Sequence, residues 1–541
     1  MKRVLYQWVK ANSVILVNAG SLVGTTAVTS VLGFVYWWLA AREFPPEAIG
    51  IASASISAMA LLGSFCMLGL GTLLITELPR QPDQAASLIS TALIAVGGAG
   101  GCISVMFVVV APYISANFQV LRASVTDIVI FASGVSLTAI TLVLDQGLIG
   151  LLRGGLQLWR NTLFAVAKLA ALLVVGLWLS HKAGITIYTT WAIGNALSLA
   201  ALAVFVWFKK GWPGRTYLPQ RRLLQKLGPA ALQHHLLNLT LQVPVLTLPV
   251  LVTALLSATT NAWFYISWMI ASCVFIVPTA LTTVLHAINS AQQSTLAHKA
   301  RATIGLALVT CIIANCVLQF DTQQVLSLFG HTYAEQATWT LRILALGAFP
   351  LIIKNHYISI CRIQDRIARA MLSMVPGSLL ELFSAALGAH LGGLTGLSLG
   401  WIIALSIESI FMLRTVYQAI WPIRPSSDMF AEDEYVRTEA IGLIETSTLP
   451  AIGHMGIEPM WLMETFVLPV IKRGHQKPEG YMLQDEGNRP QNRNRLRLKP
   501  PQLQRYPLYD DGMPITDKYV ASQFSDRRQT ENTVVEDRVM Y

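Results

Sequence analysis

Three basic side chains lie away from the loops, inside apolar stretches of the sequence: Lys168, Arg342 and Lys354. A charge near the centre of a hydrocarbon layer costs at least about 2.5 kcal/mol, so such residues usually face a partner or a water-filled cavity. Fixed cations can replace the water that an anionic group loses there. The three residues are therefore our first candidates for contacting an anionic substrate group. Arg342 could instead extend outward to the interface.

Seven further polar side chains could line the same cavity or take part in ion coupling: Asp145, His234, His235, Asn238, Gln242, Glu381 and Glu408. His234, Asn238 and Gln242 follow an i, i+4, i+8 spacing, which places them on one helical face. Together with the three cations they predict a hydrated central cavity. We place Glu381 and Arg342 nearer the outer side and most of the others in the inner half.

Several of these residues also have a structural interpretation that the sequence leaves open. An ion network could join two helices through Asp145, Arg153, Arg160 and Lys168. Glu408 could pair with Lys354 across helices. His234 and His235 are more simply explained as packing histidines than as proton relays.

The motifs expected of an enzyme are missing. The sequence has no GxxxxGK[ST] loop, no HExxH, no GxSxG and no DxD pair before the tail, so nothing indicates a nucleotide, metal or acyl-transfer site. The six cysteines fall in apolar stretches without zinc-type spacing. We expect no catalytic residue, no cofactor, no metal ion and no nucleic-acid partner.

The elements that must position these groups are membrane-spanning helices. The chain of 541 residues is 54% apolar and 13% charged, with a mean hydropathy of +0.53, and in lipid only helices or closed barrels satisfy the backbone. Helices of about 20 apolar residues cross the bilayer. We expect an all-α protein with twelve spans, at 13–41, 48–76, 86–111, 127–152, 161–180, 185–208, 229–256, 261–287, 302–320, 337–360, 367–391 and 393–420, the ninth being the shortest.

The basic residues predict the orientation of these spans. With the N-terminus in the cytoplasm, 19 Lys and Arg residues fall in inner loops or termini and 3 in outer loops, as the positive-inside rule requires. Both termini should then be cytoplasmic. The longest connection, KKGWPGRTYLPQRRLLQK, divides the spans into six and six. We therefore expect an N-terminal bundle (1–208), a basic linker (209–228), a C-terminal bundle (229–421) and a largely disordered cytoplasmic tail (422–541).

The sequence also resembles a known family. The stretch VNAGSLVGTTAVTSVLGFVYWWLAAREFPPEAIGIASASISAMALLGSFCMLGLGTLLITELPR, with LDQGLIGLLRGGLQLWRNTLFAVAKL and LFGHTYAEQATWTLRILALGAFPLIIKNHYISICRIQDR, is similar to polysaccharide-biosynthesis membrane proteins of the O-antigen flippase type. These belong to the multidrug/oligosaccharidyl-lipid/polysaccharide (MOP) exporter superfamily. The resemblance covers residues 10 to about 420 and excludes the tail.

The resemblance implies two six-helix bundles that form a V-shaped, alternating-access exporter in the bacterial inner membrane. Its cargo would be an undecaprenyl-pyrophosphate-linked glycan, moved from the inner to the outer leaflet for surface polysaccharide synthesis. The cavity cations would meet the pyrophosphate, with membrane lipids and polysaccharide assembly proteins as further partners. A drug or small-metabolite exporter of the same fold and a membrane glycan polymerase or ligase stay open as alternatives.

Overall fold

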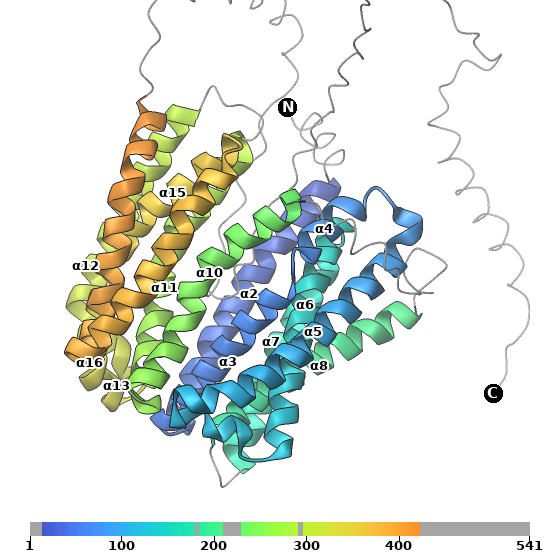
Figure 1. Cartoon of the computed structure of the whole chain (residues 1–541), viewed down its shortest axis with the longest axis horizontal. Coiled ribbons are helices and arrows are strands. Elements are labelled where there is room, and N and C mark those ends of the chain that lie inside the picture. Colours follow the sequence, from blue (N-terminus) through green and yellow to red (C-terminus); the bar gives the residue numbers. More distant parts are fainter. Residues whose placement is uncertain (1–12, 179–182, 209–228, 290–295, 422–541) are drawn as a thin grey trace, which may run out of the picture. The chain divides into compact units, whose positions relative to one another are not determined.

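The computed structural model describes residues 13–178, 183–208, 229–289 and 296–421, and these residues form an α-helical membrane protein (Figure 1). Two of the predicted segments, the basic linker and the tail, lie outside the described residues. Within the described ranges, eleven helices are long and apolar enough to cross a membrane. The all-α, multi-pass fold predicted from composition is confirmed.

The first half of the described chain contains seven α-helices and two short 3-10 helices. They are α2 (Ser13–Glu43), α3 (Pro46–Cys66), α4 (Leu70–Glu77), η1 (Pro82–Gln84), α5 (Ala85–Ile114), η2 (Ala116–Arg122), α6 (Val125–Gly150), α7 (Gly154–Trp178) and α8 (Gly184–Phe208).

The second half also contains seven α-helices. They are α10 (Pro229–Leu255), α11 (Ala258–Asn289), α12 (Leu296–Ser327), α13 (His331–Gln336), α14 (Thr338–Leu346), α15 (Ala348–Ile363) and α16 (Ile367–Ile420). We call the end of the helices that carries residues 44–45, 256–257 and 392–393 the outer end, and the opposite end the inner end, following the predicted orientation.

The last helix explains the difference between eleven and twelve spans. A straight helix of 54 residues would be about 80 Å long, far more than the roughly 30 Å of hydrocarbon. Gly392 and Gly393 have non-helical backbone angles in its middle, and the positive φ of Gly393 suits a residue without a side chain. Beyond them the chain folds back, so that Gly388 and Gly396 lie against each other. The two arms of α16 agree with the predicted spans 367–391 and 393–420.

Three other predicted spans differ in detail. The ninth is not the shortest, because α12 has 32 residues and continues past a kink at Asp321. The second is broken into α3 and α4 at Leu68 and Gly69, which both have positive φ. The tenth is broken into α14 and α15 at Gly347. Hydropathy does not detect such breaks, because the residues that carry them are themselves apolar.

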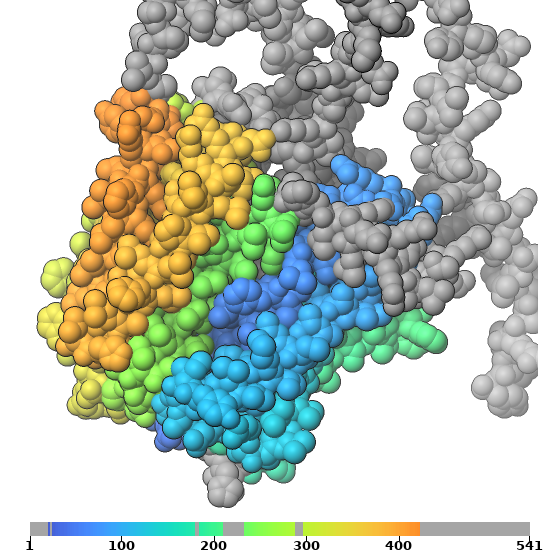
Figure 2. Space-filling model, viewed as in Figure 1, coloured from blue at the N-terminus to red at the C-terminus, as the bar shows by residue number. Residues whose placement is uncertain are grey.

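Helices α3 and α11 lie at the centre of the protein and pack against each other. In the most apolar stretch of each, 83% of the residues of α3 and 67% of those of α11 are buried, against 22% for α5, α7 and α12. The exposed helices present large apolar side chains such as Ile94, Trp178 and Phe320, as expected of a lipid-facing surface. In Figure 2 the green surface of α10 and α11 lies between the blue surface of the first half and the yellow and orange surface of the later helices.

Candidate functional site

Lys354 of α15 lies between two carboxylates of α16. Its Nζ is 2.8 Å from Glu408 Oε2 and also contacts Glu381 Oε1. The other oxygen of Glu381 accepts a hydrogen bond from Trp401 Nε1 at 2.7 Å. All four side chains are at most 5% exposed. We call Lys354, Glu381 and Glu408 the lysine–carboxylate triad. It joins α15 to both arms of α16.

A glycine makes room for this triad. A Cβ atom added at Gly377 would lie 2.4 Å from the carboxyl group of Glu408, so a side chain at that position would displace Glu408. The pairing of Glu408 with Lys354, one of the interpretations left open by the sequence, is present in the structure. Glu381 was predicted nearer the outer side, and this is wrong, because it lies at the depth of Lys354. The contact depends on how α16 packs against α15, which residue counting along the sequence does not give.

Lys168 of α7 has surroundings of a different kind. Its Nζ lies 3.7 Å from the ring centroid of Trp191, 4.8 Å from that of Phe164 and 5.2 Å from that of Tyr36. The residue is 2% exposed. An ammonium group over aromatic faces is attracted by the ring quadrupole, most strongly by tryptophan. The rings come from α2, α7 and α8, so Lys168 binds together three helices of the first half.

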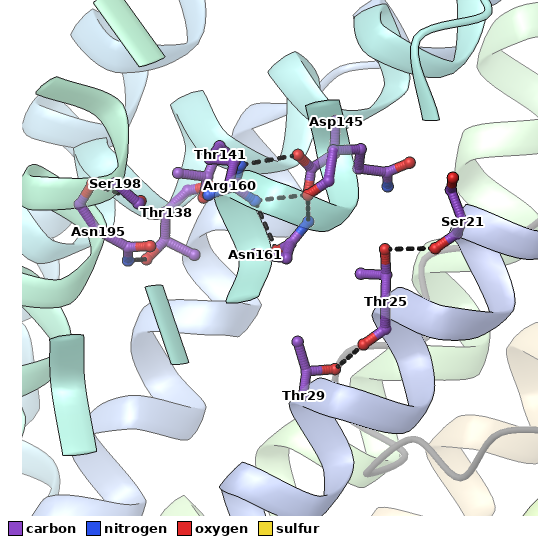
Figure 3. A network of polar contacts seen from close by, with 11 residues as sticks. Ser21, Thr25, Thr29, Thr138, Thr141, Asp145, Arg160, Asn161, Asn195 and Ser198 are labelled. Carbon is purple, nitrogen blue, oxygen red and sulfur yellow. Dashed lines mark hydrogen bonds and ion pairs between the residues drawn. The ribbon is translucent and has the colours of Figure 1, made fainter. Parts of the chain in front are cut away.

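Asp145 and Arg160 form the third charged group (Figure 3). Two nitrogens of Arg160 on α7 donate to both oxygens of Asp145 on α6, at 3.0 and 2.6 Å. Asn161 donates to Asp145 at 3.0 Å and accepts from Arg160 at 2.7 Å. The bidentate geometry is the one that guanidinium and carboxylate prefer. The predicted network between these helices is therefore present in part, through Asp145 and Arg160.

The expected span 161–180 begins one residue after Arg160, whereas the helix itself begins earlier. Arg160 is only 2% exposed, because α7 begins at Gly154 and already includes it. Gly154 and Gly155 are more typical of a loop than of a helix, so the sequence did not indicate that the helix begins there. The i+8 spacing of Arg160 and Lys168 was the available signal, since it places both on one helical face.

Arg342 differs from the other two predicted cavity cations because it is only half-buried, in the middle of the short helix α14. Its Nε donates to Thr322 Oγ1 at 3.3 Å, and its Cζ lies 5.4 Å from the ring centroid of Trp339. Trp339 is 66% exposed. This placement favours the outward extension that the sequence left open.

The polar stripe on α10 lines a small pocket between the halves. Asn238 and Gln242 lie there with His235, facing Ser64 of α3 and Gln146 of α6. Ser64 donates to Gln242 Oε1 at 3.0 Å across the halves. The pocket volume is about 30 Å³, which is room for about one water molecule. A larger ligand therefore requires the two halves to separate.

His234, the first member of the predicted stripe, does not line this pocket. It lies within electrostatic range of Arg362, while Arg362 Nη2 donates to Asn238 Oδ1 at 2.8 Å. Arg362 lies beyond the expected span 337–360 and had no expected role, whereas α15 continues to Ile363 and includes it. Its position three residues before Asp365 gave no signal of burial.

The structure does not bring Lys168, Arg342 and Lys354 to one place. Lys168 contacts helices of the first half, Lys354 contacts α16, and Arg342 lies at the outer end beside α12. What the predicted residues form is a set of separate polar groups inside two helical halves. Such polar groups inside an apolar bundle, with a wettable pocket between the halves, are typical of membrane transporters.

Known structures share this fold. The chain is similar to an inward-facing multidrug resistance MATE family transporter of the MOP superfamily, with 14% identity and a TM-score of 0.59 over 74% of this chain and 98% of the other. A MATE transporter in the straight conformation has 12% identity and a TM-score of 0.51, over 75% and 95%. A MOP superfamily transporter from Pyrococcus furiosus has 14% identity and a TM-score of 0.51, over 75% and 95%.

Comparison of the sequence with protein families gives a further similarity. Residues 15–260 match the family of polysaccharide biosynthesis proteins. No curated protein matches the chain. The predicted resemblance to polysaccharide-biosynthesis proteins of the MOP superfamily is thereby confirmed, and the multi-pass helical fold is the one that MATE transporters have. The similarity to transporters agrees with the expectation that the chain is not an enzyme.

Proposed function

We propose that this protein moves a lipid-linked oligosaccharide, carried on undecaprenyl pyrophosphate, from the inner to the outer leaflet of the bacterial inner membrane. The observation that carries the proposal is the match of residues 15–260 to polysaccharide biosynthesis proteins on a chain with a MOP transporter fold. The orientation proposed with it has both termini in the cytoplasm, where most basic loop residues would lie.

The contacts between the halves support alternating access. At the outer end Asn261 Nδ2 donates to Gly50 O at 2.8 Å and to Ser53 Oγ at 3.0 Å, and Asn117 Nδ2 donates to Thr253 O at 2.8 Å. The rings of Trp37 and Tyr265 pack there at 4.6 Å between centroids.

Farther toward the inner end, the described contacts between the halves change in character. The hydrogen bond from Ser64 to Gln242 lies beside the small polar pocket. The halves are closed by apolar and amide contacts at the outer end, and the polar pocket lies nearer the inner end. This arrangement suits a state that opens toward the inner leaflet. A headgroup from that leaflet would enter there.

The roles of the predicted cations form part of the proposal. Lys168 and Arg342 would attract the pyrophosphate, with Arg342 acting near the outer side at release. Lys354 would contact a phosphate only after exchanging a carboxylate of its triad, so its contribution would depend on Glu381 and Glu408. Asp145 and the polar residues of α10 would serve as cavity or coupling groups.

The test is a leaflet assay with the purified full-length protein in vesicles that contain undecaprenyl-pyrophosphate-linked oligosaccharide. A membrane-impermeant oxidant of sugar diols reports the fraction of glycan exposed outside. We expect the wild type to raise that fraction well above protein-free vesicles. The triple variant K168Q/R342Q/K354Q should lower the rate per inserted molecule at least tenfold.

The controls separate the alternatives. Vesicles loaded with a fluorescent cationic dye test drug export, and dye efflux without glycan movement would replace the proposal with the exporter alternative. Movement of the glycan at the wild-type rate per inserted molecule by the triple variant would keep the transport proposal and remove the three cations from it.

A further inference from the structure

Three basic side chains from three helices meet at the inner end of the second half. His234 lies on α10, His286 on the last part of α11, and Arg362 at the end of α15. Their charges lie close enough to act on one another: Arg362 acts on both histidines, and His234 acts on His286. The neighbouring segments of α11 and α15 are held together by a hydrogen bond from Ser359 Oγ to Thr282 O at 3.0 Å.

Each of the three side chains has a buried nitrogen without a hydrogen-bond partner in the described part of the chain. These atoms are Nδ1 of His234, Nδ1 of His286 and Nε of Arg362. Buried polar nitrogens are normally hydrogen-bonded, so each unsatisfied one requires an explanation. Three of them in one cluster, from three different helices, indicate a place where a ligand with several acceptor oxygens would fit.

The charge of Arg362 also indicates a ligand with acceptor oxygens. A guanidinium stays protonated in proteins, and the other buried cations with described ion pairs contact carboxylates: Arg160 has Asp145, and Lys354 has two glutamates. The hydrogen bond described for Arg362 goes to the neutral amide oxygen of Asn238. The carboxylate that acts on this cluster is Asp365, which is exposed beyond the end of α15. The cluster therefore carries positive charge without an ion-paired carboxylate among the described residues.

Asn238 connects this cluster to the pocket between the halves. It accepts the hydrogen bond from Arg362 and at the same time lines the pocket with Ser64 and Gln242. An anion that enters from the inner end can replace the amide oxygen of Asn238 as the acceptor for Arg362. The exchange would give the guanidinium a charged partner, which binds it more strongly than an amide does.

We propose that His234, His286 and Arg362 form a binding site for a phosphate or pyrophosphate group at the inner end of the second half. The guanidinium donates through Nε and Nη2, and the imidazoles donate from the other sides. In the context of the proposed function, on which this part rests, the site captures the pyrophosphate of the lipid-linked substrate before it moves outward. The same chemistry fits a free phosphate or a soluble phosphate ester, so the experiment includes both sources.

The test measures binding of inorganic pyrophosphate to the purified full-length protein in nanodiscs by isothermal titration calorimetry, with chloride as the reference anion. We expect saturable binding by the wild type and at least a tenfold loss of affinity for R362Q. The variants H234Q and H286Q should each lose affinity severalfold, because each removes one side of the site. R369Q is the matched control, since Arg369 is an exposed arginine in the first turn of α16, seven residues beyond Arg362, and it should bind like the wild type.

The variant R362K controls for folding, because it keeps the charge and loses the planar donor geometry. We expect it to elute as a folded monodisperse protein and to bind pyrophosphate more weakly than the wild type but better than R362Q. Unchanged affinity of R362Q, or equal losses in R362Q and R369Q, would overturn the site. Absence of saturable pyrophosphate binding by the wild type would overturn it as well.

The leaflet assay separates failure of this site from failure of the proposed function. Pyrophosphate binding that depends on Arg362, in a protein that moves no lipid-linked glycan, would keep the site and assign it to a soluble phosphate compound. Glycan movement by the wild type and by R362Q at equal rates, with equal pyrophosphate affinity, would keep the function and reject the site.

Discussion

Two buried lysines in the described part of the chain are held in different ways. Lys168 in the first half lies on the faces of three aromatic rings, which add no formal charge, whereas Lys354 in the second half lies between two glutamates. Both solutions lower the cost of a buried ammonium. They differ in what removal of the lysine leaves behind: polarizable rings in one case, and two buried carboxylates in the other.

The depth and charge of a buried lysine therefore do not by themselves show whether it has a functional role. The sequence gives both lysines the same description, a cation inside an apolar helix. Only the structure separates a lysine whose charge is matched by carboxylates from one that lies among rings. The difference predicts a graded series of effects on stability.

The largest effect is expected for Lys354→Met. The substitution leaves Glu381 and Glu408 buried side by side without their cation, and breaking a buried ion pair in this way costs about 3–5 kcal/mol. The measurement is the free energy of unfolding in detergent, followed by tryptophan fluorescence in denaturant. The variant K168M serves as the matched comparison, because it also exchanges a buried lysine for methionine.

A rescue variant checks the cause of this loss. Replacing both glutamates as well, in K354M/E381Q/E408Q, removes the repelling charges and should recover most of the lost stability. A loss of equal size in K354M and K168M, or no recovery in the rescue variant, would show that the carboxylates are not what distinguishes the two lysines.

Particular residues show how much of the structure could be predicted from the sequence. Hydropathy was enough to predict the apolar helices, because each span carries its own signal. The pair of Glu408 and Lys354 could be foreseen as an option, since a buried charge needs a partner. Glu381 could not be placed with them, because its contact with Lys354 depends on how α16 packs against α15.

Aromatic surroundings were equally hidden from sequence. Tyr36 and Trp191 are separated from Lys168 by many residues of sequence. Arg362 was missed because α15 continues beyond the expected span 337–360 and includes it. Burial at a helix end depends on what packs against it, which is a tertiary property.

An intermediate effect is expected for Arg160→Met. The substitution removes the bidentate partner of Asp145, but the Asp145 side chain is 18% exposed and can gain water. We therefore expect a loss of about 1–3 kcal/mol in the free energy of unfolding, below that of K354M. The double variant D145N/R160M should be more stable than R160M alone, as a double-mutant cycle would measure. Arg153→Met, at an exposed position before α7, is the control and should change stability little.

The smallest effect on stability is expected for Lys168→Met. The substitution loses cation–π attraction, worth about 0.5–2 kcal/mol, and at the same time removes the cost of burying an ammonium, so the two contributions oppose each other. Methionine also packs well against aromatic rings. We expect a change of less than about 1 kcal/mol in the free energy of unfolding in the same denaturant experiment.

Phe164→Leu, which keeps the lysine and removes one ring, tests the aromatic part separately. Destabilisation of K168M as severe as that of K354M would mean that Lys168 balances a charge in the fold, and the comparison between the two lysines would fail. A stable K168M that no longer moves glycan would instead assign the charge of Lys168 to transport, because the fold itself would not need it.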